Sequence, residues 1–349
     1  MGAQCGRHAD VARLGMLLLS TPPAPEARTS YIETATFLTA MNSWCGLRRE
    51  ALTVLESLDA VGVDILSRDN IARGWTYCAR AYVHHFLEPR PWQACLQAEE
   101  AVRAFREVNS ERNRTAPQAV WGLTLEAAGD MPRAIEVLRD AVETCQRAGQ
   151  TYATAATQMQ LVLVLSSSPE PAHQEETGHL ARHLLETTKG NLLHLGVAHL
   201  ALAKVAGAQG WHSEAESHVR QACELVGVLL HFQLIARTLL SVTLRAQGRV
   251  AEARAEVESG VQLLERMGGL GDGAVGAWLA LAEACFAQGD TSSGERALRQ
   301  ASRCMSLRAA DMPDAATRER FLSRVPENAR TLELALKQWG KDWERHAVP

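Results

Sequence analysis

Apolar residues recur along most of the chain at intervals of three and four positions. In the segment 131–147 they form one helical stripe: Ala134, Val137, Leu138, Ala141, Val142 and Cys145. This spacing places them on the same face of an α-helix, with polar residues on the opposite face. No segment sustains the alternation of apolar and polar residues that marks a strand. The pattern predicts an all-α protein.

A short phrase separates many of these stripes: a glycine followed five positions later by a small residue. It occurs at Gly46 and Ala51, Gly129 and Ala134, Gly210 and Ala215, Gly248 and Ala253, and Gly289 and Gly294. Glycine ends a helix readily because it accepts the left-handed conformation just past the last turn. The small residue lets the next helix pack closely against the first. The glycine spacings are 83, 81, 38 and 41 residues, so each long gap spans about two periods.

Each long gap contains a weaker copy of the phrase. Segment 89–94 reads PRPWQA, in which proline breaks the helix where glycine does elsewhere, and segment 166–171 is the turn cluster SSSPEP. The chain therefore predicts seven helix–turn–helix units between about residues 28 and 308. Four pairs fit the capping box of a helix N-terminus: Ser30 and Glu33, Thr115 and Gln118, Ser213 and Glu216, and Ser292 and Glu295.

These units resemble tetratricopeptide (TPR) repeats, whose pattern places small residues at fixed positions of each unit. The matching residues are Gly122, Ala134 and Ala141 in the third unit; Ala203, Ala215 and Ala222 in the fifth; Ser241, Ala253 and Gly260 in the sixth; and Ala282, Gly294 and Ala301, with Trp278, in the seventh. Leu58 and Tyr82 are large where the pattern has small residues. The period near 41 also departs from the usual value of about 34. The resemblance implies a right-handed α-solenoid.

The longer period resembles the TPR-like C-terminal regions of large bacterial signalling proteins, namely serine/threonine kinase–ATPase fusions and activators of the maltose-regulator type. Segment 320–330 (RFLSRVPENAR) is similar to the segment that often closes such regions. We predict an N-terminal helix and linker at 1–27, a repeat array at 28–310 and C-terminal capping helices at 311–349. Residues 7–19 read as one helix without a partner. This suggests the hypothesis that the chain is the tail of a longer protein with an upstream effector domain.

Composition and charge limit the range of partners. The formal net charge of −4 provides no basic surface for nucleic acid, so we expect no nucleic-acid partner. No stretch approaches the roughly 20 apolar residues of a membrane span, so we expect no membrane partner. The eight cysteines form no CxxC pair and fall mostly on apolar faces, which is typical of reduced, buried thiols in a cytoplasmic protein.

The motifs that could carry chemistry have simpler structural explanations. Segment 271–276 (GDGAVG) fits GxGxxG, but a predicted helix precedes it where a dinucleotide-binding fold requires a strand, so we predict an inter-unit turn. His179 and His183 have metal-binding spacing but no evident third ligand, which favours a solvated pair. His84 and His85 abut the turn of the second unit and indicate no site. Carboxylates are scattered over polar faces with no inward pair. We therefore expect no catalytic, cofactor-binding or metal-binding residues, no cofactor and no enzymatic activity.

The predicted function is a non-enzymatic scaffold that binds a protein or peptide partner in a concave groove. A solenoid forms such a groove from the first helix of each unit. Those helices carry Lys204 and Arg237 as isolated cations, which does not favour capture of a partner's C-terminal carboxylate. Trp92 and Trp211, at turns, are candidate contact residues. Two alternatives stay open: the sensor or regulatory tail of a kinase–ATPase signalling protein, and a regulatory array that binds a small ligand.

Overall fold

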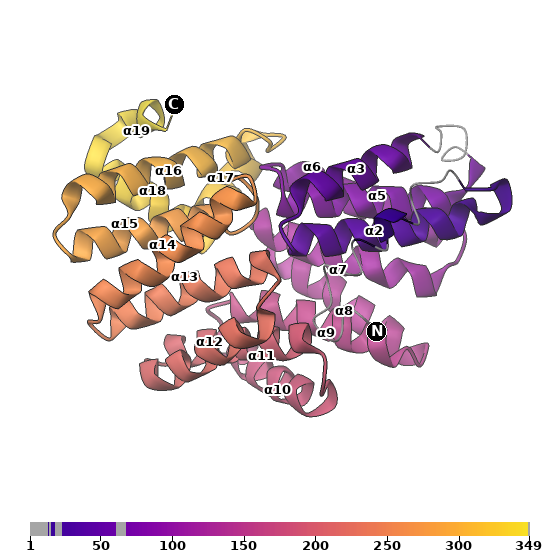
Figure 1. Ribbon diagram of the computed structural model, residues 1–349, viewed down its shortest axis with the longest axis horizontal. Coiled ribbons are helices and arrows are strands. Elements are labelled where there is room, and N and C mark those ends of the chain that lie inside the picture. The colour runs from indigo at the N-terminus through magenta and orange to yellow at the C-terminus, as the bar shows by residue number, and fades with distance from the viewer. Residues whose placement is uncertain (1–12, 14, 18–22, 61–67, 348–349) are drawn as a thin grey trace.

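The structure is a computed structural model that describes residues 13, 15–17, 23–60 and 68–347. Within those residues every regular element is a helix and none is a strand, which confirms the predicted all-α class. The helices form seven consecutive pairs followed by a C-terminal cap, and the pairs stack into a solenoid that curves back on itself (Figure 1). The predicted α-solenoid of seven helix–turn–helix units is confirmed.

The pairs follow one another along the chain. They are α2 (Arg28–Trp44) with α3 (Arg48–Ala60), α5 (Asn70–Phe86) with α6 (Pro91–Glu107), α7 (Glu111–Ala127) with α8 (Met131–Arg147), α9 (Thr151–Ser166) with α10 (Pro171–Thr187), α11 (Leu192–Ala208) with α12 (His212–Val226), α13 (Leu230–Ala246) with α14 (Val250–Arg266), and α15 (Ala274–Ala287) with α16 (Thr291–Ala309). The first helix of each pair contacts the first helix of the next, from α2 to α15.

The cap completes the C-terminal end of the array. It comprises α17 (Ala315–Arg324), α18 (Pro326–Trp339) and α19 (Trp343–His346), with the short 3₁₀ helix η2 (Gly340–Asp342) between α18 and α19. A second 3₁₀ helix, η1 (Pro25–Ala27), precedes α2 at the other end of the array. Helix α18 packs on both helices of the seventh pair, α15 and α16. It therefore covers apolar surface that the last repeat would otherwise expose.

The repeated glycines end the helices as predicted. All five adopt a positive φ, between 69° and 81°: Gly46, Gly129, Gly210, Gly248 and Gly289. After α7 the amide of Asp130 donates to the carbonyl of Leu125 at 2.8 Å, the bond that closes a helix over a left-handed residue. The two weaker copies also form turns, because α5 ends at Phe86 before α6 and α9 ends at Ser166 before α10.

Small residues permit close packing within a pair. A Cβ placed on Gly122 of α7 would lie 2.4 Å from Leu138 of α8, so no larger residue fits there without movement. Tyr82, which departs from the repeat pattern, stacks on Phe86 and meets Trp44 edge-on, with ring centroids 6.0 Å apart in both pairs. The second unit therefore uses its large residue to build an aromatic cluster with the first unit.

Helix starts differ from the prediction more than helix ends. The four predicted capping boxes are wrong, because their first residues lie inside α2, α7, α12 and α16: Ser30, Thr115, Ser213 and Ser292. Helix α16 shows one reason. Asp290, just before the helix, accepts the amide of Ser293 at 3.1 Å. Aspartate caps a helix as well as serine does, so the earlier residue takes the N-cap position.

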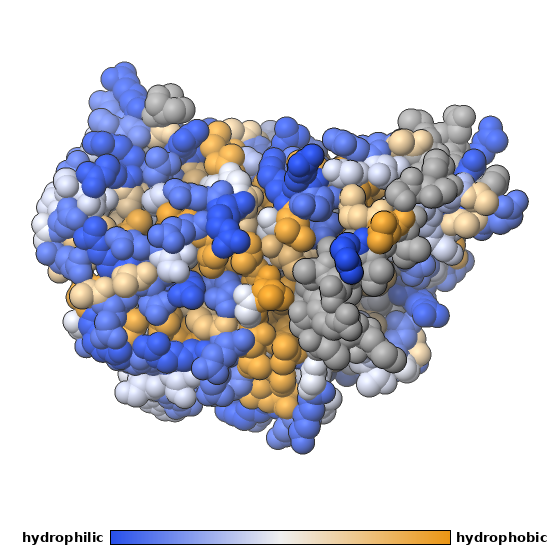
Figure 2. All heavy atoms as spheres, viewed as in Figure 1, coloured by the Kyte–Doolittle hydropathy of each residue, from blue (hydrophilic) through white to orange (hydrophobic). Residues whose placement is uncertain are grey.

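The array closes on itself, because α2 of the first pair contacts α13 of the sixth. Trp44 and Phe232 meet there with ring centroids 6.3 Å apart, and Phe86 packs edge-on against His231 at 4.7 Å. In Figure 1 this contact lies between the indigo-to-magenta half and the orange-to-yellow half, and hydrophobic residues gather on the surface in the middle of the same view (Figure 2). We call this surface the seam; it joins residues 42–48, 85–93 and 126–130 to residues 230–232, 267–273 and 308–328.

The predicted open concave groove is not found in the part of the chain that the structure describes. The ends of the first helices meet at the seam and bury their aromatic side chains on each other. Burying one large apolar side chain contributes about 1.5–3 kcal/mol, and edge-to-face ring pairs add to this. Contact of the first three units with the last two units and the cap therefore takes the place of an open groove. The predicted binding site for a partner, an open concave groove, is therefore absent from the described residues.

The remaining predictions concern thiols, membrane spans and the N-terminal segment. The described cysteines are free, and all but Cys223 are buried, while Cys5 lies outside the described residues. Burial raises the pKa of Cys45 to about 11, which keeps that thiol protonated.

Among the described helices none has an apolar run long enough to cross a bilayer. The predicted helix at 7–19 lies mostly outside the described residues, and the predicted boundaries of the three parts stay predictions.

Candidate functional site

One carboxylate holds the seam by capping a helix from the opposite end of the array. Asp311, which follows α16, accepts the backbone amides of Trp92 and Gln93 at 2.7 and 3.0 Å. These amides belong to the first turn of α6, where a helix provides no acceptor of its own. The N-cap residue of α6, Arg90, supplies no side-chain bond. Asp311 therefore takes the role of an N-cap residue across the seam.

Replacing Asp311 with alanine should lower the free energy of unfolding by about 1 kcal/mol, the usual cost of losing an N-cap side chain. Chemical denaturation of the full chain measures this change. The variant Asp311→Asn keeps one carbonyl oxygen as an acceptor and should lose less. Equal stability of the alanine variant and the parent chain would contradict the contact in solution.

The closing segment 320–330 forms a second part of the seam. Arg320 pairs with Asp130 at the turn between α7 and α8, with an N–O distance of 3.6 Å. A Cβ on Gly129 would lie 2.9 Å from the carbonyl oxygen of Arg320. Gly129 is therefore needed for two reasons, its positive φ and the close approach of this carbonyl.

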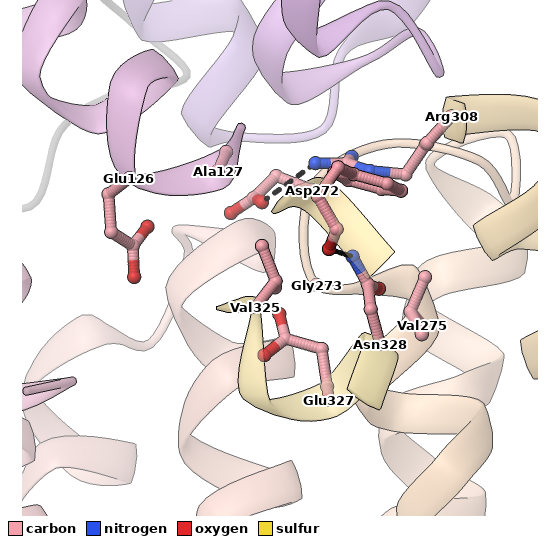
Figure 3. Close-up of a pocket in the computed structure, with 10 residues that line it drawn as sticks. Glu126, Ala127, Asp272, Gly273, Val275, Arg308, Val325, Glu327 and Asn328 are labelled. Atoms are coloured by element: carbon pink, nitrogen blue, oxygen red, sulfur yellow. Dashed lines mark hydrogen bonds and ion pairs between the residues drawn. The ribbon is translucent and has the colours of Figure 1, made fainter. Parts of the chain in front are cut away.

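A small cavity, which we call the chamber, lies in the seam where the third unit meets the cap (Figure 3). Its volume is about 20 Å³, which is room for one or two waters. Its polar lining residues are Glu126, Asp272, Arg308, Glu327 and Asn328. Three carboxylates thus come together from α7, the turn before α15, and α18. This corrects the prediction that no carboxylates gather inside the fold; closure of the array, which the repeat pattern does not specify, assembles them.

Asp272 contacts residues from both halves of the array. Its Oδ1 lies 3.6 Å from Arg308 Nη2, and its Oδ2 lies 3.6 Å from His231 Nε2 and 4.0 Å from His85 Nε2. Burial acts to raise the pKa of Asp272, but these three neighbours and a backbone amide lower it. Burial lowers the pKa of His85 to about 4 and also lowers that of His231. Both histidines are therefore neutral near pH 7, and Arg308 supplies the full charge beside Asp272.

Glu126 is linked to Lys204 through a hydroxyl group. Lys204 Nζ donates to Ser167 Oγ at 3.0 Å, and Ser167 also hydrogen-bonds Glu126. Burial raises the pKa of Glu126 to about 7, an effect that Lys204 opposes. The other two carboxylates of the chamber, Glu327 and Asp272, raise it further. The side chain keeps some open surface, so protein surrounds it without sealing it.

The raised pKa of Glu126 predicts a pH dependence of stability. The folded chain keeps this proton up to about pH 7, whereas the unfolded carboxyl releases it near 4.5. The stability from this group is therefore fully present below pH 4.5 and is lost as the pH rises through 7. The variant Glu126→Gln stays neutral, so its stability relative to the parent should rise over this window and then level off. Urea denaturation at a series of pH values measures the difference, and a difference that does not change with pH would contradict the burial of Glu126.

The wall opposite Glu126 combines acceptors with one unsatisfied donor. Burial raises the pKa of Glu327, and Asp272 adds to the effect. Asn328 is fixed because its Nδ2 donates to the carbonyl of Phe321 at 3.0 Å. Arg308 is only 5% exposed, and its Nη1 has no hydrogen-bond partner among the described residues. The chamber thus contains carboxylate acceptors and a buried donor that lacks an acceptor.

A larger cleft lies away from the seam, among α13, α15, α16 and α18, with about 260 Å³ of space. Glu283 lies in it and accepts from Arg245 at 2.7 Å and from Arg330 at 2.9 Å. Two arginines of this cleft therefore share one carboxylate, and its third cation, Lys337, is exposed. The chamber, with its unsatisfied donor and shifted pKa values, is the stronger candidate site.

The other residues selected from the sequence lie apart from the chamber. His179 and His183 are exposed on α10, and His179 lies 3.8 Å from Glu175, as a solvated pair would. Trp211 is 57% exposed, whereas Trp92 is half-buried beside the seam. No three His, Cys, Asp or Glu side chains in the described part of the chain are arranged to hold a metal ion.

Sequence reasoning misses the residues of the chamber. Asp272 lies in the turn at 271–273, and the rest of the segment 271–276 begins α15; His85 lies in the last turn of α5, next to the turn of the second unit. Segment 320–330 supplies Glu327 and Asn328. The sequence signal that could have indicated these residues is the presence of polar residues at the junctions between units. These residues come together only when the array closes, and no single unit encodes that closure.

The fold and the seam define a TPR-like helical-repeat protein with a closed array. No protein-family model matches the chain, and no curated protein matches it. Among solved structures it is similar to a Rap protein complexed with Competence and Sporulation Factor, with 12% identity, a TM-score of 0.56, and coverage of 98% of this chain and 94% of that chain. It is also similar to the human IFIT1 dimer with m7Gppp-AAAA, with 13% identity, a TM-score of 0.48, and coverage of 97% and 72%. At 12% identity the likeness to the Rap protein shows the fold alone.

Proposed function

We propose that the chain is a non-enzymatic regulatory scaffold that binds a protein or peptide partner and responds to it through the seam. The observation that carries this proposal is the closure of the array, which joins its two halves around a charged chamber. The likeness over the full chain to a Rap protein complexed with another factor supports it, because a similar fold there takes part in a complex.

The chamber favours binding over catalysis. The pKa of Glu126 is raised and that of Asp272 is lowered, an arrangement that acid–base pairs in enzymes also use. However, space for one or two waters leaves no room for a substrate beside these groups. One or two small polar groups fit, so the chamber suits recognition of one end of a ligand whose remainder stays outside.

The seam gives a physical route from binding to regulation. Glu126 belongs to the third unit, whereas Arg308 and Glu327 belong to the seventh unit and the cap. A partner that contacts both sides stabilises the closed array, and a partner that inserts between them stabilises an open one. Either partner changes which surfaces of the array are exposed.

The test is affinity capture on the immobilised full chain from an extract of the organism that encodes it. Each captured protein is then titrated in purified form against the parent chain and against the variant Gly271→Ala, whose seam should not close. We expect at least one partner whose affinity differs between the two chains by roughly tenfold. The proposal fails if no purified protein or peptide binds either chain.

A regulatory array for a small ligand is a second candidate, because the chamber is a preformed polar site. A thermal-shift screen of the full chain against metabolites tests it, and no shift with any compound would count against it. The sensor tail of a kinase–ATPase protein rests on the repeat resemblance, and the genomic sequence upstream of the chain tests that proposal.

A further inference from the structure

The chamber combines features that select one chemical group. We propose that it binds the free amino terminus of a peptide, with the ammonium group between Glu126 and Glu327 and the first carbonyl oxygen accepting a hydrogen bond from Arg308 Nη1. This inference rests on the function proposed above and names the part of the partner that the chamber recognises. Figure 3 shows the side chains of these residues around a common space.

The carboxylates determine that the bound group is a cation. Asp272 already has Arg308 beside it at 3.6 Å, and Lys204 reaches Glu126 through Ser167. Glu126 and Glu327 form no ion pair with a described residue, although the charges of Lys204 and Arg308 act to lower the pKa of Glu327. An ammonium group between Glu126 and Glu327 would lower the raised pKa values of both side chains and favour their charged forms, and it brings three N–H donors for their oxygens.

Arg308 distinguishes an amino terminus from a lysine side chain. Its Nη1 is buried without an acceptor, and a buried donor in that state costs free energy until an acceptor reaches it. A lysine ammonium group brings no acceptor with it. The first residue of a peptide carries its carbonyl oxygen close to its ammonium group, so it satisfies the Arg308 donor and the two carboxylates together.

The size of the chamber excludes a blocked terminus. Its volume of about 20 Å³ holds one or two groups of the size of water, and the ammonium group and the first carbonyl oxygen would occupy that space. An acetylated terminus is larger, carries no charge and offers one N–H in place of three. The remainder of the peptide would leave the chamber along the seam, where it contacts both halves of the array.

Glycinamide is the smallest probe that carries an ammonium group next to a carbonyl group. Methylammonium lacks the carbonyl, and N-acetylglycinamide lacks the ammonium. We expect glycinamide at millimolar concentration to raise the melting temperature of the full chain and to shift its NMR signals in a saturable way. Methylammonium should bind about tenfold more weakly, and N-acetylglycinamide should produce no shift.

Two variants on one helix test the assignment of residues. Glu327→Gln should weaken glycinamide binding by about tenfold or more, because a neutral amide replaces a charged acceptor. Glu333→Gln is the matched control, since Glu333 also lies on α18 but pairs with Arg330 at 2.8 Å outside the chamber. It should leave the affinity unchanged. If Glu327→Gln does not fold, Glu126→Gln tests the other carboxylate in the same way.

Equal effects of glycinamide and N-acetylglycinamide would overturn the inference, and so would an unchanged affinity in the folded Glu327→Gln or Glu126→Gln variant. Neither result contradicts the proposed function, which is supported if a captured partner still binds the chain. Conversely, glycinamide binding without any protein or peptide partner would support the chamber as a site and contradict the scaffold.

Discussion

Gly271→Ala is expected to lower the free energy of unfolding by about 2 kcal/mol or more and to open the seam. A Cβ at this position would lie 1.9 Å from the carbonyl oxygen of Phe86 and 2.8 Å from its carbonyl carbon. The atoms that would have to move belong to the backbone, so no change of rotamer relieves the clash. Overpacking costs about 1–3 kcal/mol where side chains can adjust, and here the loss of seam contacts adds to that cost. Urea denaturation measures the change.

Gly276→Ala is the matched control, because Gly276 closes the same GDGAVG segment. No atom lies within 4 Å of a Cβ at this position, and the residue is inside α15. Alanine is preferred over glycine in a helix by about 1 kcal/mol, so this variant should be at least as stable as the parent. Equal stability of the two alanine variants would mean that Gly271 does not approach Phe86.

Asp272→Ala should lower the free energy of unfolding by about 3 kcal/mol. The change leaves Arg308, whose side chain is 7% exposed, without its carboxylate. A guanidinium group held away from water without a counter-charge is costly. His85 and His231 cannot replace the lost negative charge, because an imidazole ring is either neutral or positive, and burial lowers their pKa values and keeps both rings neutral near pH 7. Denaturation at pH 7 measures the loss.

The double variant Asp272→Ala with Arg308→Met separates loss of the pair from loss of the carboxylate alone. It removes both charges and fills the space of the guanidinium with an apolar chain, so it should recover most of the lost stability. A double-mutant cycle measures this coupling. If the stability loss of the double variant equals the sum of the losses of the two single variants, Arg308 does not depend on Asp272.

The helical pairs could be predicted because their signals are local. Gly129 adopts its positive φ while the next residue, Asp130, bonds back to Leu125, so the whole turn is encoded within six residues. The two turns that lack the glycine phrase could be predicted from the repeat period, since Pro91 and Pro171 begin α6 and α10 at the expected places. The exact first residue of a helix was harder to place, because serine, threonine and aspartate all serve as N-caps and often lie near one another.

The seam could not be predicted in the same way, because it depends on small rotations between units that accumulate around the array. Trp44 and Phe232 meet across it although more than half of the chain separates them. Asp272 lies in a turn whose sequence gives no indication of its partner Arg308. One signal was available: Tyr82 is large where the repeat needs a small residue, and it packs against Trp44 beside the seam.

Hydrogen exchange at the amides of Trp92 and Gln93 tests the closed array most directly. These amides lie in the first turn of α6, so they are protected only if Asp311 reaches them from the other end of the chain. The closed array predicts that both exchange more slowly than the first-turn amide of Arg133 in α8, and that Asp311→Ala removes the protection. Exchange of Trp92 and Gln93 as fast as that of Arg133 in the parent chain would contradict the closure.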